Sequence, residues 1–364
     1  MPSPLTHPLS SSRFSNLVRM VARYGCEPRY LPRLMGVGLI SLLRQPIFIY
    51  ENIKYAKRID EQALPKDPIF VIGHWRSGTT HLQNILSLDP QFASVTLREA
   101  AMPLDFLTLG KRIEKSFEQS IPEKRLMDNV EVAAASAWEE ELALVSTSPL
   151  SFYHVSFFPK DNDSIFRDSI LFNGGKPELI EQWRRDYLWF LKKVSLIKSG
   201  KRLLLKNPAN TARIKLLLEL FPEAKFIHIK RDPYQVYRST VHLYDKAQQE
   251  WGFHKASQDR IKAHVLKSYP LFMRAYFEQR DLIPRGQFAE LSFEDLESAP
   301  LSTIEQAYED SGISGFEAVK PRVENYLSRI NGYQKNPHVI SENDTLKLRE
   351  NWSEWFDRLG YEME

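Results

Sequence analysis

The sequence predicts an α/β fold in which a parallel sheet is covered by helices on both faces. Two observations lead to this prediction. Short, fully apolar runs of strand length alternate with longer segments in which apolar residues recur every three to four positions, as they do in helices. The 364 residues also include 43% apolar and 12% aromatic residues, which is enough for a large packed core and argues against disorder.

The chain begins with a basic segment. Residues 1–50 contain six arginines, no lysine and one acid, so this segment carries +5 and the rest of the chain sums to −2. A surface that binds nucleic acid normally belongs to the folded body, so we expect no nucleic-acid partner. The first residues also lack a continuous apolar core, which makes a secretory signal peptide an unfavoured interpretation.

An apolar stretch follows at Leu34–Leu43 and resumes after Arg44 and Pro46. Its ten residues are fewer than the roughly 20 that a membrane span needs. Two interpretations stay open, a helix packed on the domain or an arginine-rich segment lying on a membrane through residues 1–50. We therefore expect an N-terminal helical extension over residues 1–60 and one domain over residues 61–364.

The first strand is expected at Pro68–Gly73, an apolar run that ends in glycine. A helix is expected at Thr79–Leu88, because leucines and isoleucines recur there on one face and Asp89-Pro90 ends the pattern. A second strand is expected just before Thr96. Each of these strands would be buried in the sheet.

The same alternation recurs later in the chain. We expect a strand at 203–206, an apolar helix at 211–220, a strand at 225–230 and a further helix after Pro233. Strands that alternate with helices in this way form a parallel sheet with helices on both faces.

The turn after the first strand is the segment most informative about function, Gly73-His-Trp-Arg-Ser-Gly-Thr-Thr80. Gly73 and Gly78 have the spacing of a P-loop, but Thr79 stands where a P-loop has its lysine. The backbone N–H groups at the start of the helix still form an anion site. The side chains that add a cation and hydroxyl donors are Arg76, Ser77, Thr79 and Thr80. The sequence thus predicts a P-loop-like sheet that binds a phosphate-like group, with triphosphate hydrolysis unfavoured.

A second signal follows the strand at 225–230. Arg231 stands at the carboxyl end of that strand, and Ser239 lies eight residues later on the next helix. Ligands of parallel sheets bind outside the carboxyl ends of the strands, so both segments are expected to face one crevice.

These residues resemble the sulfotransferases that use 3′-phosphoadenosine 5′-phosphosulfate (PAPS), in the bacterial-type branch related to the tyrosylprotein enzymes. The resemblance covers residues 65–361, through G-H-W-R-S-G-T-T at 73–80, R-L-M-D-N at 125–129, E-E-E-L-A-L at 139–144, L-L-K-N-P at 204–208, F-P-E-A-K-F-I-H-I-K-R-D-P at 221–233 and Y-Q-K-N at 333–336. Asn207, Asn210, Leu104 and Asp105 depart from the pattern of that branch.

The resemblance implies a role for each motif. The loop with Arg76 would hold the 5′-phosphosulfate, and Arg231 with Ser239 would hold the 3′-phosphate. Lys206 would lie near the transferring group, and Lys335, next to Tyr333 and Asn336, would contribute a further contact to the 3′-phosphate. No metal is expected, because the cations already named can stabilise the charge of the leaving phosphate.

Transfer to an alcohol also needs a base. Glu99, after the expected second strand, stands where the resembling enzymes have a catalytic carboxylate or amide; an ion pair with Arg98 or another arginine is the equally weighted alternative. Glu140 or Glu141, in the acidic run at 139–141, is the reserve candidate, although such runs are usually solvated or capping. His74 and His81 flank the loop and are less favoured as bases.

The predicted function is transfer of a sulfuryl group from PAPS to a hydroxyl of an acceptor that is lipid-like or a glycan. The alternatives are a P-loop-like kinase and a catalytically idle nucleotide-binding protein at a membrane. The acceptor pocket is expected along residues 100–170, whose aromatic residues include Phe106, Phe117, Trp138, Phe152, Tyr153, Phe157 and Phe158. A single cysteine, Cys26, fits a cytoplasmic location, with membrane association open.

Overall fold

The computed structural model describes residues 4–110, 112–121, 132–174, 176–330 and 340–363. The chain divides into two compact units. The helical unit consists of Met1–Leu64, Val95–Gly200 and His242–Ile261, and the sheet unit of Pro65–Ser94, Lys201–Val241 and Lys262–Glu364. Residues 1–64 therefore share a unit with two later segments, while the predicted domain boundary after residue 60 stays a prediction.

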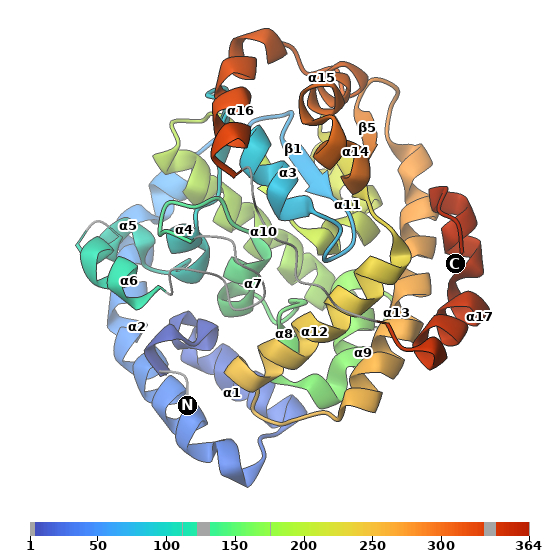
Figure 1. Cartoon of the computed structure of the whole chain (residues 1–364). Coiled ribbons are helices and arrows are strands. Elements are labelled where there is room, and N and C mark those ends of the chain that lie inside the picture. Colours follow the sequence, from blue (N-terminus) through green and yellow to red (C-terminus); the bar gives the residue numbers. More distant parts are fainter. Residues whose placement is uncertain (1–3, 111, 122–131, 175, 331–339, 364) are drawn as a thin grey trace. The chain divides into compact units, whose positions relative to one another are not determined.

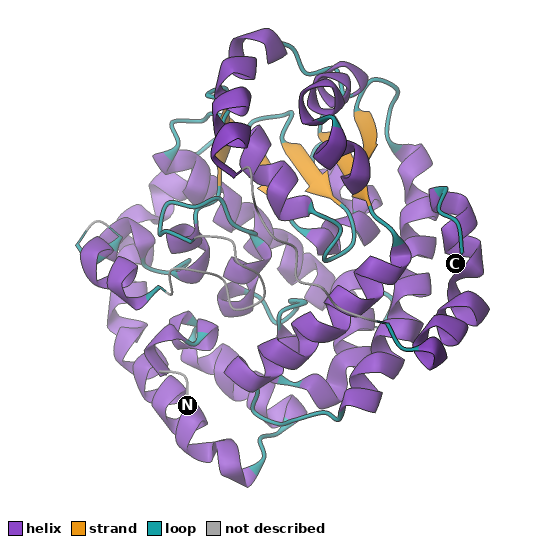
Figure 2. Ribbon diagram, in the orientation of Figure 1, coloured by secondary structure: helices purple, strands orange, loops and turns teal. Residues whose placement is uncertain are grey.

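Within the described residues, the sheet unit has five strands in one sheet, in the order β2-β3-β1-β4-β5 (Figure 2). The strands are β1 Ile69–Ile72, β2 Phe92–Ser94, β3 Arg202–Lys206, β4 Lys225–Lys230 and β5 Phe288–Ser292. All four neighbouring pairs are parallel, with Val71 opposite Lys206 and Ile72 opposite His228. The predicted parallel sheet is confirmed, and the carboxyl ends of β3, β1 and β4 meet at one edge.

Helices cover both faces of this sheet. On one face, Val71 and Ile229 pack in a common core with α3 Thr79–Leu86, which lies beside β1 in Figure 1. On the other face, Phe70 contacts Phe221 with ring centroids 6.1 Å apart, and His228 stacks on Tyr276 at 4.1 Å. The remaining helices that begin or end in the sheet unit are α11 Ile214–Leu220, α12 Pro233–Trp251, α13 Gln258–Gln279, α14 Phe293–Ser298, α15 Pro300–Asp310, α16 Phe316–Ile330 and α17 Glu342–Leu359.

The helical unit has no strand among its described residues apart from a single bridge between Thr96 and Ala137. Its α-helices are α1 Phe14–Tyr24, α2 Leu31–Asp60, α4 Leu97–Ala101, α5 Phe106–Leu109, α6 Glu114–Ser120, α7 Glu141–Thr147, α8 His154–Phe157, α9 Asn162–Phe166 and α10 Pro177–Ile197. Shorter helical turns in the two units are Pro4–Thr6, Pro8–Ser11, Pro28–Tyr30, Pro159–Asp161, Arg167–Leu171, Pro208–Ala212 and Arg280–Leu282.

The N-terminal apolar stretch, judged from the sequence too short to span a membrane, is part of a longer helix. α2 runs without a break through Pro46 for 30 residues, and by length and composition alone it is apolar enough to cross a membrane. A proline inside a helix removes one backbone donor. Ser41 and Phe48, on either side of Pro46, are both buried in the helical unit.

Candidate active site

The loop between β1 and α3 is shaped by two glycines. Gly73 and Gly78 have φ values of +146° and +101°, which side chains rarely adopt. A Cβ at Gly73 would lie 2.4 Å from the carbonyl oxygen of Ile229, so only glycine fits there. Thr211 fixes the start of the loop, since its hydroxyl accepts from Gly73 N at 2.7 Å and donates to Gly73 O at 3.2 Å.

Arg76 contacts Ser239, a pairing that the sequence did not predict, although it predicted that their two segments face one crevice. Arg76 adopts a positive φ of 72°, which is unusual for arginine. Its Nε donates to Ser239 Oγ at 2.8 Å, and its carbonyl oxygen accepts from Arg231 Nη1 at 3.0 Å. Two hydrogen bonds between predicted site residues thus join the loop directly to α12 and to the β4–α12 connection.

The loop has a free buried donor for an anion. The Ser77 hydroxyl is buried and has no hydrogen-bond partner among the described residues, and the same holds for Nε of Arg231. Burial lowers the pKa of the Arg231 guanidinium from its usual value, yet an arginine keeps its charge in proteins. One of these desolvated donors lies in the loop and the other directly after β4, and both are available to an anionic ligand.

Phe293 connects the two parts of this site. Its ring lies 4.1 Å from the Arg231 guanidinium carbon, and a Cβ at Gly78 would approach the same ring to 2.3 Å. The aromatic face therefore packs against the anion loop and stacks on the arginine. Sequence reasoning missed Phe293, because it follows β5, more than 200 residues after the loop.

Lys206 lies at the same edge of the sheet. It is 2% exposed, and its Nζ donates to Thr80 Oγ1 at 3.4 Å, which places this cation beside the start of α3. Asn207 caps the turn that follows, since its Oδ1 accepts from Ala209 N at 3.0 Å, and Asn210 accepts from Arg213 at 3.4 Å. These two departures from the family pattern have structural roles here.

Glu99 lies in the helical unit, at the third position of α4. It forms a capping box, because Glu99 Oε2 accepts from Thr96 N at 2.9 Å and Thr96 Oγ1 accepts from Glu99 N at 3.4 Å. Its Oε1 is 2.9 Å from Lys198 Nζ, so its ion-pair partner is a lysine, whereas Arg98 pairs with Glu114. The sequence signal for this cap was present, as Thr96 and Glu99 have the spacing of a capping box. The catalytic role of Glu99 stays a prediction.

The acidic run at 139–141 is buried, so its expected solvation is wrong. Glu139, Glu140 and Glu141 are 8%, 0% and 1% exposed. Glu139 accepts from Tyr153, Glu140 accepts from Tyr187 at 3.1 Å, and Glu141 accepts from the backbone N of Phe152 at 2.7 Å. Burial and the two neighbouring carboxylates raise the pKa of Glu140 to about 7, which suits proton transfer near neutral pH.

The two histidines beside the loop are held neutral. Burial lowers the pKa of His74 to about 4, and its Nδ1 is 2.8 Å from Trp75 O. Burial also lowers the pKa of His81, which lies near Tyr326. Lys335, Tyr333 and Asn336, and the motif at 125–129, lie outside the described residues, so their predicted roles stay predictions.

The predicted aromatic lining divides into two groups. Phe106, Phe152, Phe157 and Phe158 are at most 6% exposed and belong to the core. Phe117, Trp138 and Tyr153 are half-buried. Only the second group keeps accessible surface for an acceptor.

Comparisons with known proteins agree on one family. A model described as the sulfotransferase family matches residues 68–318. The chain is 31% identical over 323 residues to omega-hydroxy-beta-dihydromenaquinone-9 sulfotransferase Stf3 of Mycobacterium bovis, and the match covers 89% of this chain and 82% of that protein. The Stf3 protein of Mycobacterium tuberculosis matches with the same identity and the same coverage.

Solved structures show the same fold. Sulfotransferase STF9 from Mycobacterium avium matches with a TM-score of 0.67 and 16% identity, over 97% of this chain and 98% of that one. Sulfotransferase STF1 from Mycobacterium tuberculosis matches with a TM-score of 0.60 and 19% identity, over 87% and 90% of the two chains. With the family model and the 31% identical relative, these matches show that the chain belongs to the sulfotransferase family.

Proposed function

We propose that this sulfotransferase takes its sulfuryl group from PAPS and transfers it to the hydroxyl of a long apolar lipid. One observation carries the donor assignment. Arg76 and Ser239 are joined by a hydrogen bond, and Arg231 donates to the carbonyl of Arg76, so the two segments predicted to bind anions are in direct contact. A nucleotide with phosphate groups at both the 3′ and 5′ positions matches such a site.

The reaction breaks the bond between sulfur and the bridging phosphate oxygen and forms a bond between sulfur and the acceptor oxygen. We propose that Arg76, the loop N–H groups and the buried Ser77 hydroxyl stabilise the charge that grows on the leaving phosphate. The Ser77 hydroxyl supports this role because it has no hydrogen-bond partner among the described residues. Lys206, held beside Thr80, supplies a second cation. The acceptor loses its proton to a carboxylate, for which we propose Glu99.

The acceptor class follows from the relative that shares 31% identity, whose name gives a hydroxylated dihydromenaquinone as its substrate. A lipid of this kind presents one hydroxyl at the end of a long apolar chain. We propose the same class for this chain, together with a cytoplasmic location, which the single cysteine supports.

The donor half is tested by the binding of adenosine 3′,5′-bisphosphate, measured by calorimetry. Arg76→Ala and Ser239→Ala are each expected to weaken binding about tenfold or more, because each loses a hydrogen bond to a charged group. Lys215→Ala, a substitution on exposed surface of α11, serves as the control. Binding that is unaffected by both site variants, or ATP binding stronger than that of the bisphosphate, would contradict the assignment.

The acceptor half is tested by incubating the protein with radiolabelled PAPS and separate lipid, glycan and protein fractions. Label is expected in the lipid fraction, at the hydroxyl end of an isoprenoid or alkyl chain. Transfer to soluble glycans alone would overturn the lipid proposal and leave the donor assignment standing.

The base is tested with Glu99→Gln. We expect kcat to fall about 100-fold or more, with little change in the KM for PAPS, because only proton removal is affected. Glu114→Gln, which breaks the neighbouring ion pair with Arg98, is the matched control. Wild-type kcat in Glu99→Gln together with a loss in Glu140→Gln would move the role of base to Glu140.

A further inference from the structure

One face of α2 is apolar and open to solvent. Between residues 31 and 50 every exposed side chain of this helix is apolar, a proline or a tyrosine. The exposed fractions of Met35, Leu39 and Ile49 are 73%, 58% and 59%. We call this surface the α2 apolar face, defined by Leu31, Met35, Leu39, Leu42, Leu43, Pro46, Ile49, Tyr50 and Ile53. At 1.5 Å per residue it is about 33 Å long.

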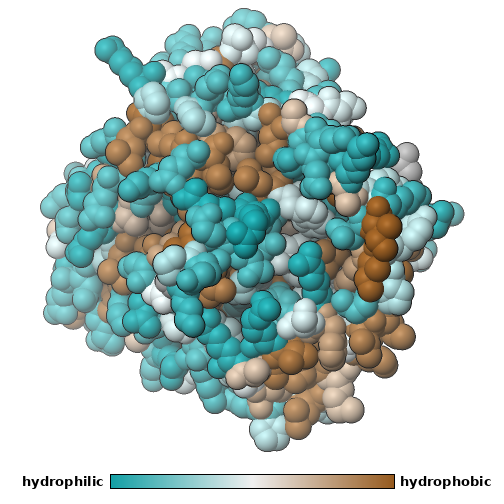
Figure 3. Space-filling model, turned by 180° about the vertical axis from the view of Figure 1, so that it is seen from behind, coloured by the Kyte–Doolittle hydropathy of each residue, from teal (hydrophilic) through white to brown (hydrophobic). Residues whose placement is uncertain are grey.

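The space-filling view places this face in the molecule. Figure 3 shows hydrophobic residues gathered at the lower right, over the region where α2 lies once the view of Figure 1 is turned around. Isolated exposed apolar residues are ordinary, but a contiguous patch of this length marks an interaction surface.

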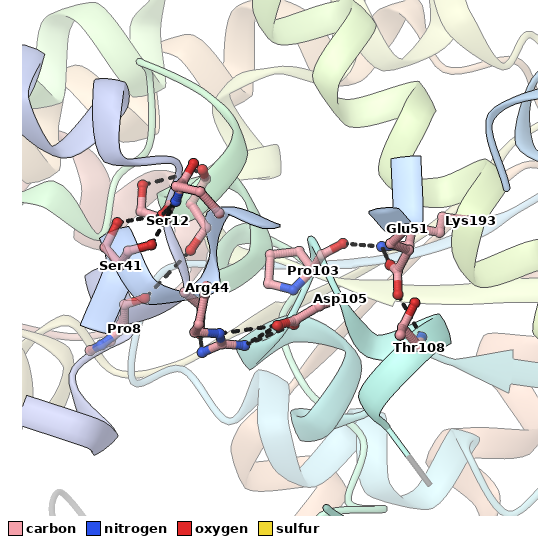
Figure 4. A network of polar contacts seen from close by, with 12 residues as sticks. Pro8, Ser12, Ser41, Arg44, Glu51, Pro103, Asp105, Thr108 and Lys193 are labelled. Atoms are coloured by element: carbon pink, nitrogen blue, oxygen red, sulfur yellow. Dashed lines mark hydrogen bonds and ion pairs between the residues drawn. The ribbon is translucent and has the colours of Figure 1, made fainter. Parts of the chain in front are cut away.

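The opposite face of α2 is fastened to the helical unit. Arg44 pairs with Asp105 at 2.7 Å, and Glu51 pairs with Lys193, in a pair whose side chains are at most 2% exposed (Figure 4). Ser41 also donates to Ser12 O at 2.8 Å. A helix that crossed a membrane would have to leave these partners, at the cost of buried charges without counter-ions. α2 is therefore suited to lie on a membrane and not to span it.

Cations and tyrosines stand together at both ends of the α2 apolar face. At the N-terminal end, the Arg29 guanidinium lies 4.7 Å from the Tyr30 ring. At the C-terminal end, Lys54 lies 5.3 Å from the Tyr50 ring, and Arg58 lies 5.7 Å from the Tyr55 ring. Tyrosines, lysines and arginines are the side chains that settle at the headgroup level of a membrane, with their apolar parts inward and their polar ends in water.

We infer that the α2 apolar face docks on an anionic phospholipid surface and holds the enzyme at the membrane. Residues 13–33 contain five arginines and one acid, and four of these arginines, Arg13, Arg19, Arg23 and Arg29, are exposed. Arg23 pairs with Asp168 and Arg29 with Glu27, so Arg13 and Arg19 are the exposed cations that anionic headgroups would complement most directly. Two copies packed face to face would bring arginines and lysines together at the ends, which is repulsive. The inference rests on α2 and not on the identity of the acceptor.

The test is sedimentation of the full-length protein with lipid vesicles, without donor or acceptor. Binding is expected to vesicles that contain phosphatidylglycerol, to weaken with added salt, and to be weaker for pure phosphatidylcholine. Leu39→Glu/Leu42→Glu is expected to lower the affinity about tenfold or more, because it places charges in the apolar layer.

The matched control is Leu282→Glu/Leu346→Glu. These leucines are 52% and 55% exposed, against 58% and 51% for Leu39 and Leu42, but lie in other elements. This control is expected to bind vesicles like the wild type, and both variants are expected to keep wild-type circular dichroism and bisphosphate affinity. Equal vesicle binding by Leu39→Glu/Leu42→Glu and the wild type would overturn the inference. So would a wild-type dimer that this variant converts to a monomer without any binding to vesicles.

Because the assay contains no acceptor, its outcome is separate from that of the acceptor experiment. Vesicle binding with label only in glycans would keep the membrane inference and reject the lipid acceptor.

Discussion

Single residues in the sheet unit shape the proposed anion site. Arg231 is a desolvated cation whose position is fixed from two sides, by the carbonyl of Arg76 at 3.0 Å and by the ring of Phe293 at 4.1 Å. A guanidinium held in this way is oriented before the ligand arrives, which lowers the entropy lost on binding. We therefore predict that Phe293 positions Arg231 for the proposed 3′-phosphate.

The role of Phe293 predicts a selective loss in Phe293→Leu. A cation–π contact contributes about 0.5–2 kcal/mol, so affinity for adenosine 3′,5′-bisphosphate is expected to fall roughly 3- to 30-fold. Affinity for adenosine 5′-monophosphate, which lacks the 3′-phosphate, is expected to change little. Calorimetry with the two nucleotides measures the ratio of their affinities in each variant. Phe293→Tyr keeps the aromatic face and is expected to bind adenosine 3′,5′-bisphosphate like the wild type. If Phe293→Leu instead loses equal affinity for both nucleotides, the cause is a general packing defect.

Glu140 gives the stability of the protein a specific pH dependence. Burial raises the pKa of its carboxyl from 4.5 to about 7, so between these values the folded protein holds a proton that the unfolded chain has released. Stability therefore falls as pH rises through this window, by roughly 3 kcal/mol at most. Glu140→Gln lacks the titration, and its melting temperature is expected to change less than that of the wild type between about pH 5 and pH 8. If the melting temperatures of the wild type and Glu140→Gln changed with pH in the same way, Glu140 would not titrate in this range.

At the scale of elements, α2 has two faces with different tasks. Its inner face carries buried polar groups that fix its position, and Figure 4 shows how Lys193 of α10 reaches Glu51 and the carbonyl oxygen of Pro103. Glu51 also accepts from Thr108 N at the start of α5. These contacts join three segments that are distant in the sequence, so the outer face is presented on a rigid support.

The buried pair predicts an asymmetric response to substitution. Lys193→Met leaves Glu51 buried without its cation and is expected to lower the free energy of unfolding by roughly 3–5 kcal/mol. The double variant Glu51→Gln/Lys193→Met removes both charges and is expected to recover most of that loss. Urea unfolding measures the free energy of unfolding of both variants and of the wild type. A single variant as stable as the wild type would mean that the pair contributes nothing to holding α2.

At the scale of the whole molecule, charge is divided between two parts of the chain. Residues 1–50 carry +5, and the rest of the chain sums to −2. Within the body, Arg76, Lys206 and Arg231 are the cations that we propose bind the donor, and the basic segment is the part that we propose binds a membrane. This division fits an enzyme with a small charged donor and an apolar acceptor better than a protein with a broad basic surface.

The same set of cations predicts catalysis without a metal. Activity with PAPS is expected to persist in excess EDTA, because arginine, lysine and backbone N–H groups stabilise the leaving phosphate. Turnover measured before and after chelation checks this. Complete loss of activity that magnesium restores would contradict it.

The sequence by itself determined the parallel sheet and the anion loop. Both depend on local patterns, the apolar runs of strand length and the spacing of Gly73 and Gly78, and these patterns act through neighbouring residues in the chain. The sequence also predicted that the loop and the segment after the strand at 225–230 lie near each other, because parallel strands bring their carboxyl ends to one edge. The contact between Arg76 and Ser239 came from the structure.

Only the tertiary structure decided which partners the charged groups have. The sequence could not show that Lys198 is the ion-pair partner of Glu99, that Phe293 stacks on Arg231, or that the acids at 139–141 are buried. It also could not show that α2 continues through Pro46, with one face held by buried ion pairs and the other face exposed to solvent. Burial and pairing arise between residues far apart in the chain, and local periodicity carries no information about them.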